Sequence, residues 1–154
     1  MWKNLIAGGY KMLHMVIEQT YKYPMRMEYD AETGKFIESE YKSLQYVRNF
    51  TKPYGWIKES GHPPFPHWDC ILMTDSEYDL GDEIEIRIIG VFKREDFDHK
   101  YVVVEISRDI SDLSELTETE MDELKKLYPR ISEGEGWFGK EVAEYCMKNY
   151  EKSL

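Results

Sequence analysis

Short strand-like segments fill most of this chain, and that pattern limits its fold more than any other feature. Between Lys11 and Asp109, runs of β-branched and aromatic residues alternate with clusters of Gly, Pro and Asp. In Glu83–Ile88 every second residue is Ile, so one face of the strand is apolar and the other is charged. A chain of 154 residues has room for one ordinary domain. Many short strands in one domain favour a closed or nearly closed barrel, which leaves few exposed edges.

Further strands are predicted on both sides of this segment. Met25–Asp30 and Lys35–Glu40 flank a short polar linker that ends in Gly34, and this arrangement predicts a hairpin. The remaining strands are predicted over Tyr54–Lys58, Trp68–Thr74, Ile89–Lys93 and Tyr101–Ile106.

The pattern changes to helix after Asp109. Thr117–Glu120 has the spacing of a capping box, and an apolar stripe follows it until Pro129. A second helix is predicted after Gly136 and runs to about Tyr150. Its inner face is expected to carry Val142, Tyr145, Cys146 and Asn149.

Charge and composition exclude several classes of protein. The formal net charge is −10, which on average repels a nucleic-acid backbone, so an anionic ligand would need a local basic patch or bound cations. The two cysteines fit no disulfide framework or zinc spacing, which favours a reduced intracellular protein. No signal-peptide pattern and no run of about 20 apolar residues occurs, so we expect a cytoplasmic protein that does not enter membranes.

Several segments, in the right order, resemble the soluble (family I) inorganic pyrophosphatases. The segments that carry the resemblance are Val16–Glu18, Arg26–Asp30, Pro53–Ile57, Ile89–Asp96 and Glu135–Trp137. The resemblance begins at about Met15 and leaves residues 1–14 as an extension of uncertain role to a single domain over residues 1–154. It implies an α+β, mainly β fold: a five-stranded, OB-like closed barrel with a flanking hairpin and two C-terminal helices.

The resemblance also implies a function and a set of site residues. The family hydrolyses diphosphate to two phosphates with Mg²⁺, here with Mn²⁺ or Zn²⁺ as alternatives, and bacterial relatives commonly assemble as hexamers. The implied metal ligands are Glu18, Glu28, Asp69, Asp96 and Asp98. The implied phosphate-binding residues are Arg26, Tyr54, Lys100 and Tyr128. Glu40 falls where the family has an Arg after the hairpin, so Lys42 and Arg48 stay open as substitutes.

The family signature Asp-x-Asp-Pro-x-Asp is incomplete in this chain. Counted from Tyr54 without a gap, the first Asp, a metal ligand in the family, corresponds to Pro64. The second, the family's candidate base for the attacking water, corresponds to Pro66, and only the third is kept, as Asp69. Pro offers neither a side-chain oxygen nor an N–H. Because loss of a general base costs roughly 10²- to 10⁴-fold in rate, we expect weak or altered hydrolysis of diphosphate or of another phosphoanhydride.

Alternative interpretations stay open. The chain could be a non-catalytic homologue that binds metal and phosphate or regulates a partner. His62, His67, Asp69 and Cys70 could form a site for a softer ion such as Zn²⁺ or Mn²⁺. We favour instead a Pro-rich loop with exposed histidines and a core-facing Cys70, because neighbouring strand residues point to opposite faces. A nucleic-acid-binding OB fold is disfavoured by the acidic charge and by the lack of a basic aromatic groove.

Overall fold

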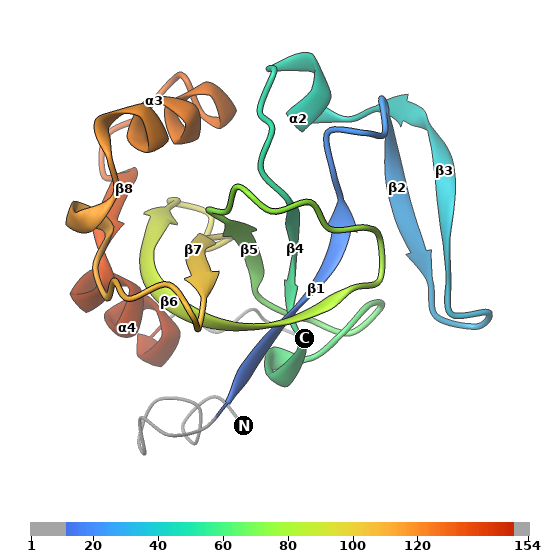
Figure 1. Ribbon diagram of the computed structural model, residues 1–154, viewed down its shortest axis with the longest axis horizontal. Helices are drawn as coiled ribbons and strands as arrows, with labels where there is room; N and C mark the ends of the chain where they lie inside the picture. Colours follow the sequence, from blue (N-terminus) through green and yellow to red (C-terminus); the bar gives the residue numbers. More distant parts are fainter. Residues whose placement is uncertain (1–11, 150–154) are drawn as a thin grey trace.

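The computed structural model describes residues 12–149, in which five strands close into a barrel (Figure 1). Most of the extension over residues 1–14 and the predicted helix end at Tyr150 lie outside the described residues. The barrel strands are β1 (Leu13–Gln19), β4 (Tyr54–Ile57), β5 (Asp69–Leu72), β6 (Glu83–Lys93) and β7 (Lys100–Glu105). Their order is β1-β4-β5-β7-β6, and pairing of β1 with β6 closes the circle. The β5–β7 pair is parallel, whereas the other barrel pairs are antiparallel. The predicted five-stranded barrel is confirmed.

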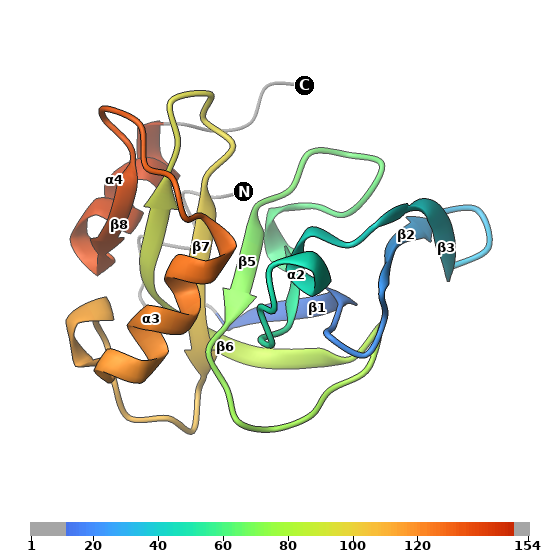
Figure 2. The ribbon, with the colours of Figure 1, turned by 90° about the horizontal axis from the view of Figure 1, so that it is seen from above.

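The predicted hairpin is also confirmed. Strands β2 (Met25–Asp30) and β3 (Lys35–Lys42) pair with each other in a separate two-stranded sheet. Gly34 closes the turn at φ 70°, a conformation that L side chains rarely adopt. The hairpin projects from one side of the barrel, opposite the C-terminal helices (Figures 1 and 2). A short helix that was not predicted, α2 (Leu44–Val47), follows the hairpin, and four residues are too few to show a helical period.

The helical region forms two helices and one additional strand. Helix α3 (Glu118–Leu127) begins with the predicted capping box, in which the side chains of Thr117 and Glu120 each accept the other residue's backbone N–H. The second predicted helix begins later than expected, because β8 (Gly136–Gly139) first pairs with β6. Helix α4 (Lys140–Asn149) follows it directly.

The predicted inner face of α4 is partly wrong. Cys146 is buried and Val142 packs partly against the core, but Tyr145 and Asn149 are exposed, and the helix buries Ala143 and Met147 instead. Because α4 begins at Lys140 and not directly after Gly136, the face that it buries differs from the face predicted for the longer helix. Two turns of 3₁₀ helix complete the elements, Lys58–Ser60 and Leu113–Glu115.

Strand β6 spans two segments, Glu83–Ile88 and Ile89–Lys93, that the sequence pattern predicts as separate strands. It runs without interruption for 11 residues, but its pairing with β7 shifts between Ile88 and Gly90. Ile88 and Ile89, on either side of the predicted break, are both buried, so the alternation ends there although the strand continues. The first half of β6 pairs with β1 and the second half with β8, and the strand curves around the barrel (Figure 1). Such an irregularity bends a strand and helps to close a barrel.

Two apolar clusters share the strands. Along β7, Tyr101 and Val103 belong to a cluster that includes α4, whereas Val102 and Val104 belong to a cluster that includes α3. Because successive side chains of a strand point to opposite faces, an apolar run without alternation predicts burial on both faces. Helices α4 and α3 therefore pack in the two apolar clusters that lie on opposite faces of β7. None of the described helices is long and apolar enough to cross a membrane.

Candidate functional site

A cavity of about 800 Å³ lies between the hairpin and the barrel strands. Its lining brings together residues from β1, β2, β3, α2, β4, β5, β7 and the end of α3. Eight of the nine residues that sequence reasoning singled out line it: Glu18, Arg26, Glu28, Tyr54, Asp69, Asp98, Lys100 and Tyr128. The ninth, Asp96, does not; its Oδ1 accepts the backbone N–H of Asp98 and its Oδ2 lies 3.5 Å from Arg94. Its predicted role as a metal ligand stays a prediction.

A buried lysine neutralises two of the carboxylates. Nζ of Lys100 lies 2.7 Å from Oδ2 of Asp69 and 3.1 Å from Oδ2 of Asp98. The parallel pairing of β5 with β7 places Asp69 directly beside Lys100. Burial alone would lower the pKa of Lys100, but Asp69, Tyr128 and Asp98 together outweigh it and the pKa is raised overall, so the ammonium stays charged. Asp69 and Asp98 thus stay close together at the cavity wall.

Glu18 on β1 lines the same cavity. Burial, followed by repulsion from Asp69, raises its pKa from 4.5 to about 7. Among the described residues no hydrogen-bond donor or ion-pair partner contacts its carboxylate. A partly buried carboxylate without a partner is stabilised by a bound cation or by a proton.

His67 is the residue that sequence reasoning placed wrongly. It was expected to be exposed, but only 18% of its side chain is accessible and it lines the cavity, where its Nε2 lies 3.1 Å from Oδ1 of Asp69. Burial would lower the pKa of His67, yet the hydrogen bond to Asp69 and the charge of Asp69 outweigh it and raise the pKa overall. The rest of the expectation agrees with the structure, since His62 is exposed and Cys70 is fully buried in the core.

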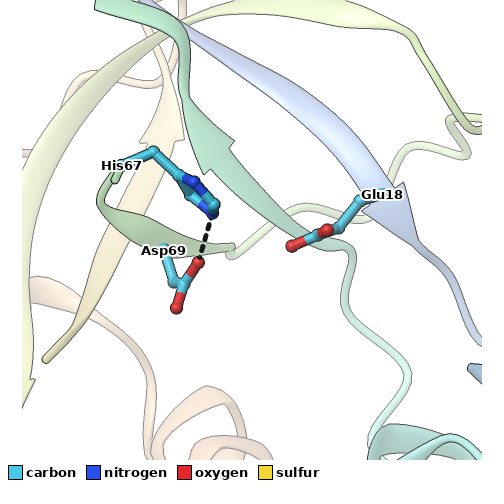
Figure 3. Close-up of side chains that lie close together, drawn as sticks. All are labelled: Glu18, His67 and Asp69. Atoms are coloured by element: carbon cyan, nitrogen blue, oxygen red, sulfur yellow. Dashed lines mark ion pairs between the residues drawn. The ribbon is translucent and has the colours of Figure 1, made fainter. Parts of the chain in front are cut away.

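Glu18, His67 and Asp69 form a compact group of potential metal ligands. One ligand atom from each lies within 4.8 Å of the others, and Figure 3 shows the three side chains approaching a common space from β1, β5 and the loop before β5. Two carboxylates and one imidazole are a donor set that divalent cations accept. The chain therefore offers residues that fit a divalent metal ion.

The cavity also carries more positive charge than the chain as a whole. Its lining holds four carboxylates, from Glu18, Glu28, Asp69 and Asp98. It holds five cationic side chains, from Arg26, Lys42, Arg48, Arg94 and Lys100. Lys42 and Arg48, which the sequence left open as substitutes for the family Arg, both line the cavity, whereas Glu40 does not. Arg48 donates a hydrogen bond to the backbone carbonyl of Leu127, which ties it to the end of α3.

Arg94 is a cavity residue that sequence reasoning missed. Its guanidinium lies 5.7 Å from the ring centre of Tyr128, which in turn stacks on Phe92 at 4.4 Å. The available signal was its place within Ile89–Asp96, one of the segments that carry the resemblance. A cation at that point changes the charge of the cavity without changing the strand pattern.

Comparison with known proteins assigns the chain to a family. The family described as inorganic pyrophosphatase matches residues 15–152, which is most of the chain. The chain belongs to the inorganic pyrophosphatase family. That span agrees with the stretch over which the motifs resemble the family. None of the curated proteins matches the sequence.

Solved structures share the pyrophosphatase fold with this chain. An inorganic pyrophosphatase from Neisseria gonorrhoeae superposes with a TM-score of 0.69 at 20% identity, covering 90% of this chain and 88% of that one. One from Ehrlichia chaffeensis gives 0.67 at 19% identity, covering 92% and 94%. One from Thermus thermophilus gives 0.64 at 19% identity, covering 93% and 91%. At these identities the likeness establishes the fold and leaves the site chemistry to be argued from this chain's own residues.

The proline-rich loop before β5 holds Pro64 and Pro66, which the sequence resemblance predicts to stand at two positions of the family signature. Of its prolines, Pro63 lines the cavity, whereas Pro64 and Pro66 are not among the lining residues. Pro64 is exposed and Pro66 is partly exposed. In this pyrophosphatase-family protein the loop thus contributes Pro63 and the His67 imidazole to the cavity, next to the Asp69 carboxylate at the start of β5.

Proposed function

We propose that this protein binds diphosphate or a related phosphoanhydride together with a divalent cation in the cavity, and that it hydrolyses this ligand only weakly. The observation that carries the proposal is the charge of the cavity. Five cationic side chains and four carboxylates converge there, in a chain whose net charge is −10. An anion is steered to such a local basic surface, and the carboxylates can hold the cation that accompanies it.

The cationic residues surround the cavity on several sides. Arg26 reaches it from the hairpin, Lys100 from β7 and Arg94 from the loop after β6. Arginine side chains bind phosphate oxygens in a bidentate manner, which fixes orientation as well as charge. Burial raises the pKa of Tyr54 well above its usual value, so its hydroxyl stays protonated and able to donate a hydrogen bond to a phosphate oxygen.

Glu18, His67 and Asp69 would hold the divalent cation. Such a cation, when bound, neutralises phosphoryl charge and lowers the pKa of water. The chain's own contribution is to orient the phosphates between Arg26 and Lys100. Weak turnover is expected because Pro64 and Pro66, which the resemblance places at two carboxylate positions, cannot bind an ion or accept a proton through their side chains. The second candidate function, binding without turnover, is favoured by the same two residues.

Phosphate release separates the two candidates. Purified protein is given diphosphate with Mg²⁺, Mn²⁺ or Zn²⁺, and the wild type is compared with Asp69→Asn and with the control Asp75→Asn, whose carboxylate is exposed outside the cavity. Slow turnover that disappears in Asp69→Asn and persists in Asp75→Asn supports the enzyme. Binding by calorimetry with no phosphate release supports the non-catalytic homologue, and failure to bind diphosphate under all conditions contradicts both.

The family resemblance further supports assembly as a homo-oligomer, which we propose to be a hexamer. Exposed apolar side chains are available for contact between copies, among them Ile37, Tyr41, Val47 and Phe138. Light scattering coupled to gel filtration measures the mass directly. A mass equal to that of one 18.4 kDa chain at micromolar concentration would contradict the assembly.

A further inference from the structure

The orientation of the His67 ring is defined by hydrogen-bond acceptors on both of its nitrogens. Nδ1 lies 3.1 Å from the backbone carbonyl oxygen of Phe65, and a carbonyl oxygen only accepts. Nδ1 must therefore carry a proton and donate it. In the neutral ring this leaves the lone pair on Nε2, which faces Oδ1 of Asp69 at 3.1 Å. Two acceptors at that distance require a positively charged species between them, either a proton or a metal ion.

A second carboxylate faces the same position. Glu18 offers an oxygen within 4.8 Å of both the His67 nitrogen and the Asp69 oxygen. Within residues 12–149, no side-chain or backbone donor forms a hydrogen bond with the Glu18 carboxylate. A proton on His67 satisfies one acceptor and leaves the second carboxylate partly buried and without a partner. A divalent cation satisfies all three groups at once, which is why we prefer it over the proton.

Asp69 is already prepared for this role by Lys100. Its Oδ2 binds the lysine at 2.7 Å, so Oδ1 is the atom directed at His67. The Phe65 carbonyl plays the corresponding part for His67, because metal-binding imidazoles almost always donate their second N–H to a carbonyl or carboxylate. These outer contacts hold both ligands in the orientation that ion binding requires.

We propose that Glu18, His67 and Asp69 form a mixed nitrogen and oxygen metal site that selects borderline ions such as Zn²⁺ or Co²⁺ over Mg²⁺. Imidazole suits Zn²⁺ and related transition metals, whereas Mg²⁺ strongly prefers oxygen ligands in octahedral geometry. This inference rests on the proposed function, since it identifies the cation that accompanies the phosphate ligand. It differs from the harder, carboxylate-based Mg²⁺ chemistry that the family resemblance implies.

Metal affinity, measured without substrate, tests the inference. Calorimetry with Zn²⁺, Co²⁺ and Mg²⁺ is performed on the wild type, on His67→Gln and on the matched control His62→Gln. His62 lies on the same loop but is exposed and does not line the cavity. Visible absorption of bound Co²⁺ is recorded in parallel, because the spectrum reports the ligands directly and does not depend on activity.

The expected result is one strong site for Zn²⁺ and Co²⁺ with much weaker binding of Mg²⁺. His67→Gln should weaken Zn²⁺ binding at least tenfold and change the Co²⁺ spectrum, because the substitution removes a metal ligand, and losing even the hydrogen-bond partner of a ligand typically weakens metal affinity by about tenfold or more. His62→Gln should match the wild type. Circular dichroism confirms that each variant is folded. Equal affinity in the two variants, or a wild-type preference for Mg²⁺, would overturn the proposal.

The same samples distinguish this inference from the proposed function. Diphosphate binding is measured separately in the presence of saturating Mg²⁺. If diphosphate binds but His67→Gln leaves the ion preference unchanged, the proposed function stands and the His67 site is wrong. If Zn²⁺ binds through His67 but diphosphate does not bind with any ion, the metal site stands and the proposed function fails.

Discussion

Lys100 determines the charge balance of the cavity. Only 7% of its side chain is exposed, and it is shared by two carboxylates that would otherwise repel each other. The same ammonium was predicted to bind phosphate. Both roles are compatible, because a bound anion can share the lysine with Asp69 once a cation has taken part of the carboxylate charge.

Substitution Lys100→Met is expected to weaken diphosphate binding at least tenfold and to lower the free energy of unfolding by roughly 2–4 kcal/mol, since the buried Asp69 carboxylate loses its lysine partner. Calorimetry and urea unfolding measure the two effects. Lys58→Met is the control, because the Lys58–Glu83 pair is about half exposed on both sides and contributes little. A Lys100→Met protein as stable as the control would contradict the assigned role.

Between elements, one ion pair connects α3 to the barrel. The guanidinium of Arg108 donates two parallel hydrogen bonds to Glu120, at 2.7 and 2.8 Å, and a third at 3.2 Å to the carbonyl of Met73 after β5. The hydrogen bond from Arg108 is the main reason that the pKa of Glu120 falls from 4.5 to about 2. This contact, together with the buried Leu124 and Leu127, holds α3 against the barrel, and the end of α3 borders the cavity.

The stability of the protein should depend on pH through Glu120. A carboxyl with a lowered folded-state pKa stabilises the fold fully above about 4.5 and loses that contribution as the pH falls toward 2. Urea unfolding at pH 6 should show Glu120→Gln less stable than the wild type by roughly 1–2 kcal/mol. The gap should narrow at pH 3. Glu118→Gln, an exposed residue of the same helical turn, should show no such convergence; a constant gap for Glu120→Gln would refute the linkage.

The contact between β1 and β4 depends on a single glycine. A Cβ on Gly55 would lie 1.9 Å from the backbone oxygen of Val16, so the two strands could not pair at their present distance. A Cβ on Gly34, in contrast, would lie at an ordinary contact distance of 3.9 Å from the Tyr29 hydroxyl, but Gly34 has a positive φ of 70°. Gly55→Ala is expected to cost more than about 3 kcal/mol of unfolding free energy or to prevent folding, and Gly34→Ala roughly 1–2 kcal/mol. Thermal unfolding of the two variants gives the comparison, and equal losses would disagree with this explanation.

At the scale of the whole molecule, the cavity joins the hairpin to the barrel. Arg26 comes from the hairpin and Lys100 from the barrel, so a ligand that contacts both should hold the two parts together. Ligand binding to the native state alone stabilises that state by mass action. The hairpin is the part with the smaller buried surface, since most of β3 is exposed.

Diphosphate with a divalent cation is therefore expected to slow hydrogen exchange of the β2 and β3 amides and to raise the melting temperature. Arg26→Met should lose most of this protection. Lys35→Met, an exposed cation on the same hairpin outside the cavity lining, should retain it. Exchange measured by mass spectrometry resolves the hairpin, and protection that is indifferent to Arg26 would place the ligand elsewhere.

Sequence patterns were enough to predict the hairpin, the barrel strands apart from the continuity of β6, the capped start of α3 and eight residues of the cavity lining. These follow from local signals: alternation of apolar residues in β6, Gly34 in the turn, Thr117 at the helix start and the order of the family motifs. Such signals act over a few residues and are therefore visible in one dimension.

The continuity of β6, the rotation of α4 and the direction of His67 could not be predicted from local patterns. Each depends on a partner distant in sequence: β8 pairs with β6, the barrel selects which face of α4 is buried, and the pairing of β5 with β4 and β7 turns Asp69 toward His67 and Lys100. Alternation predicts only that Asp69 and Cys70 point to opposite faces. The closure of the barrel decides which of these faces lines the cavity. It also brings Glu18 of β1 to the same cavity.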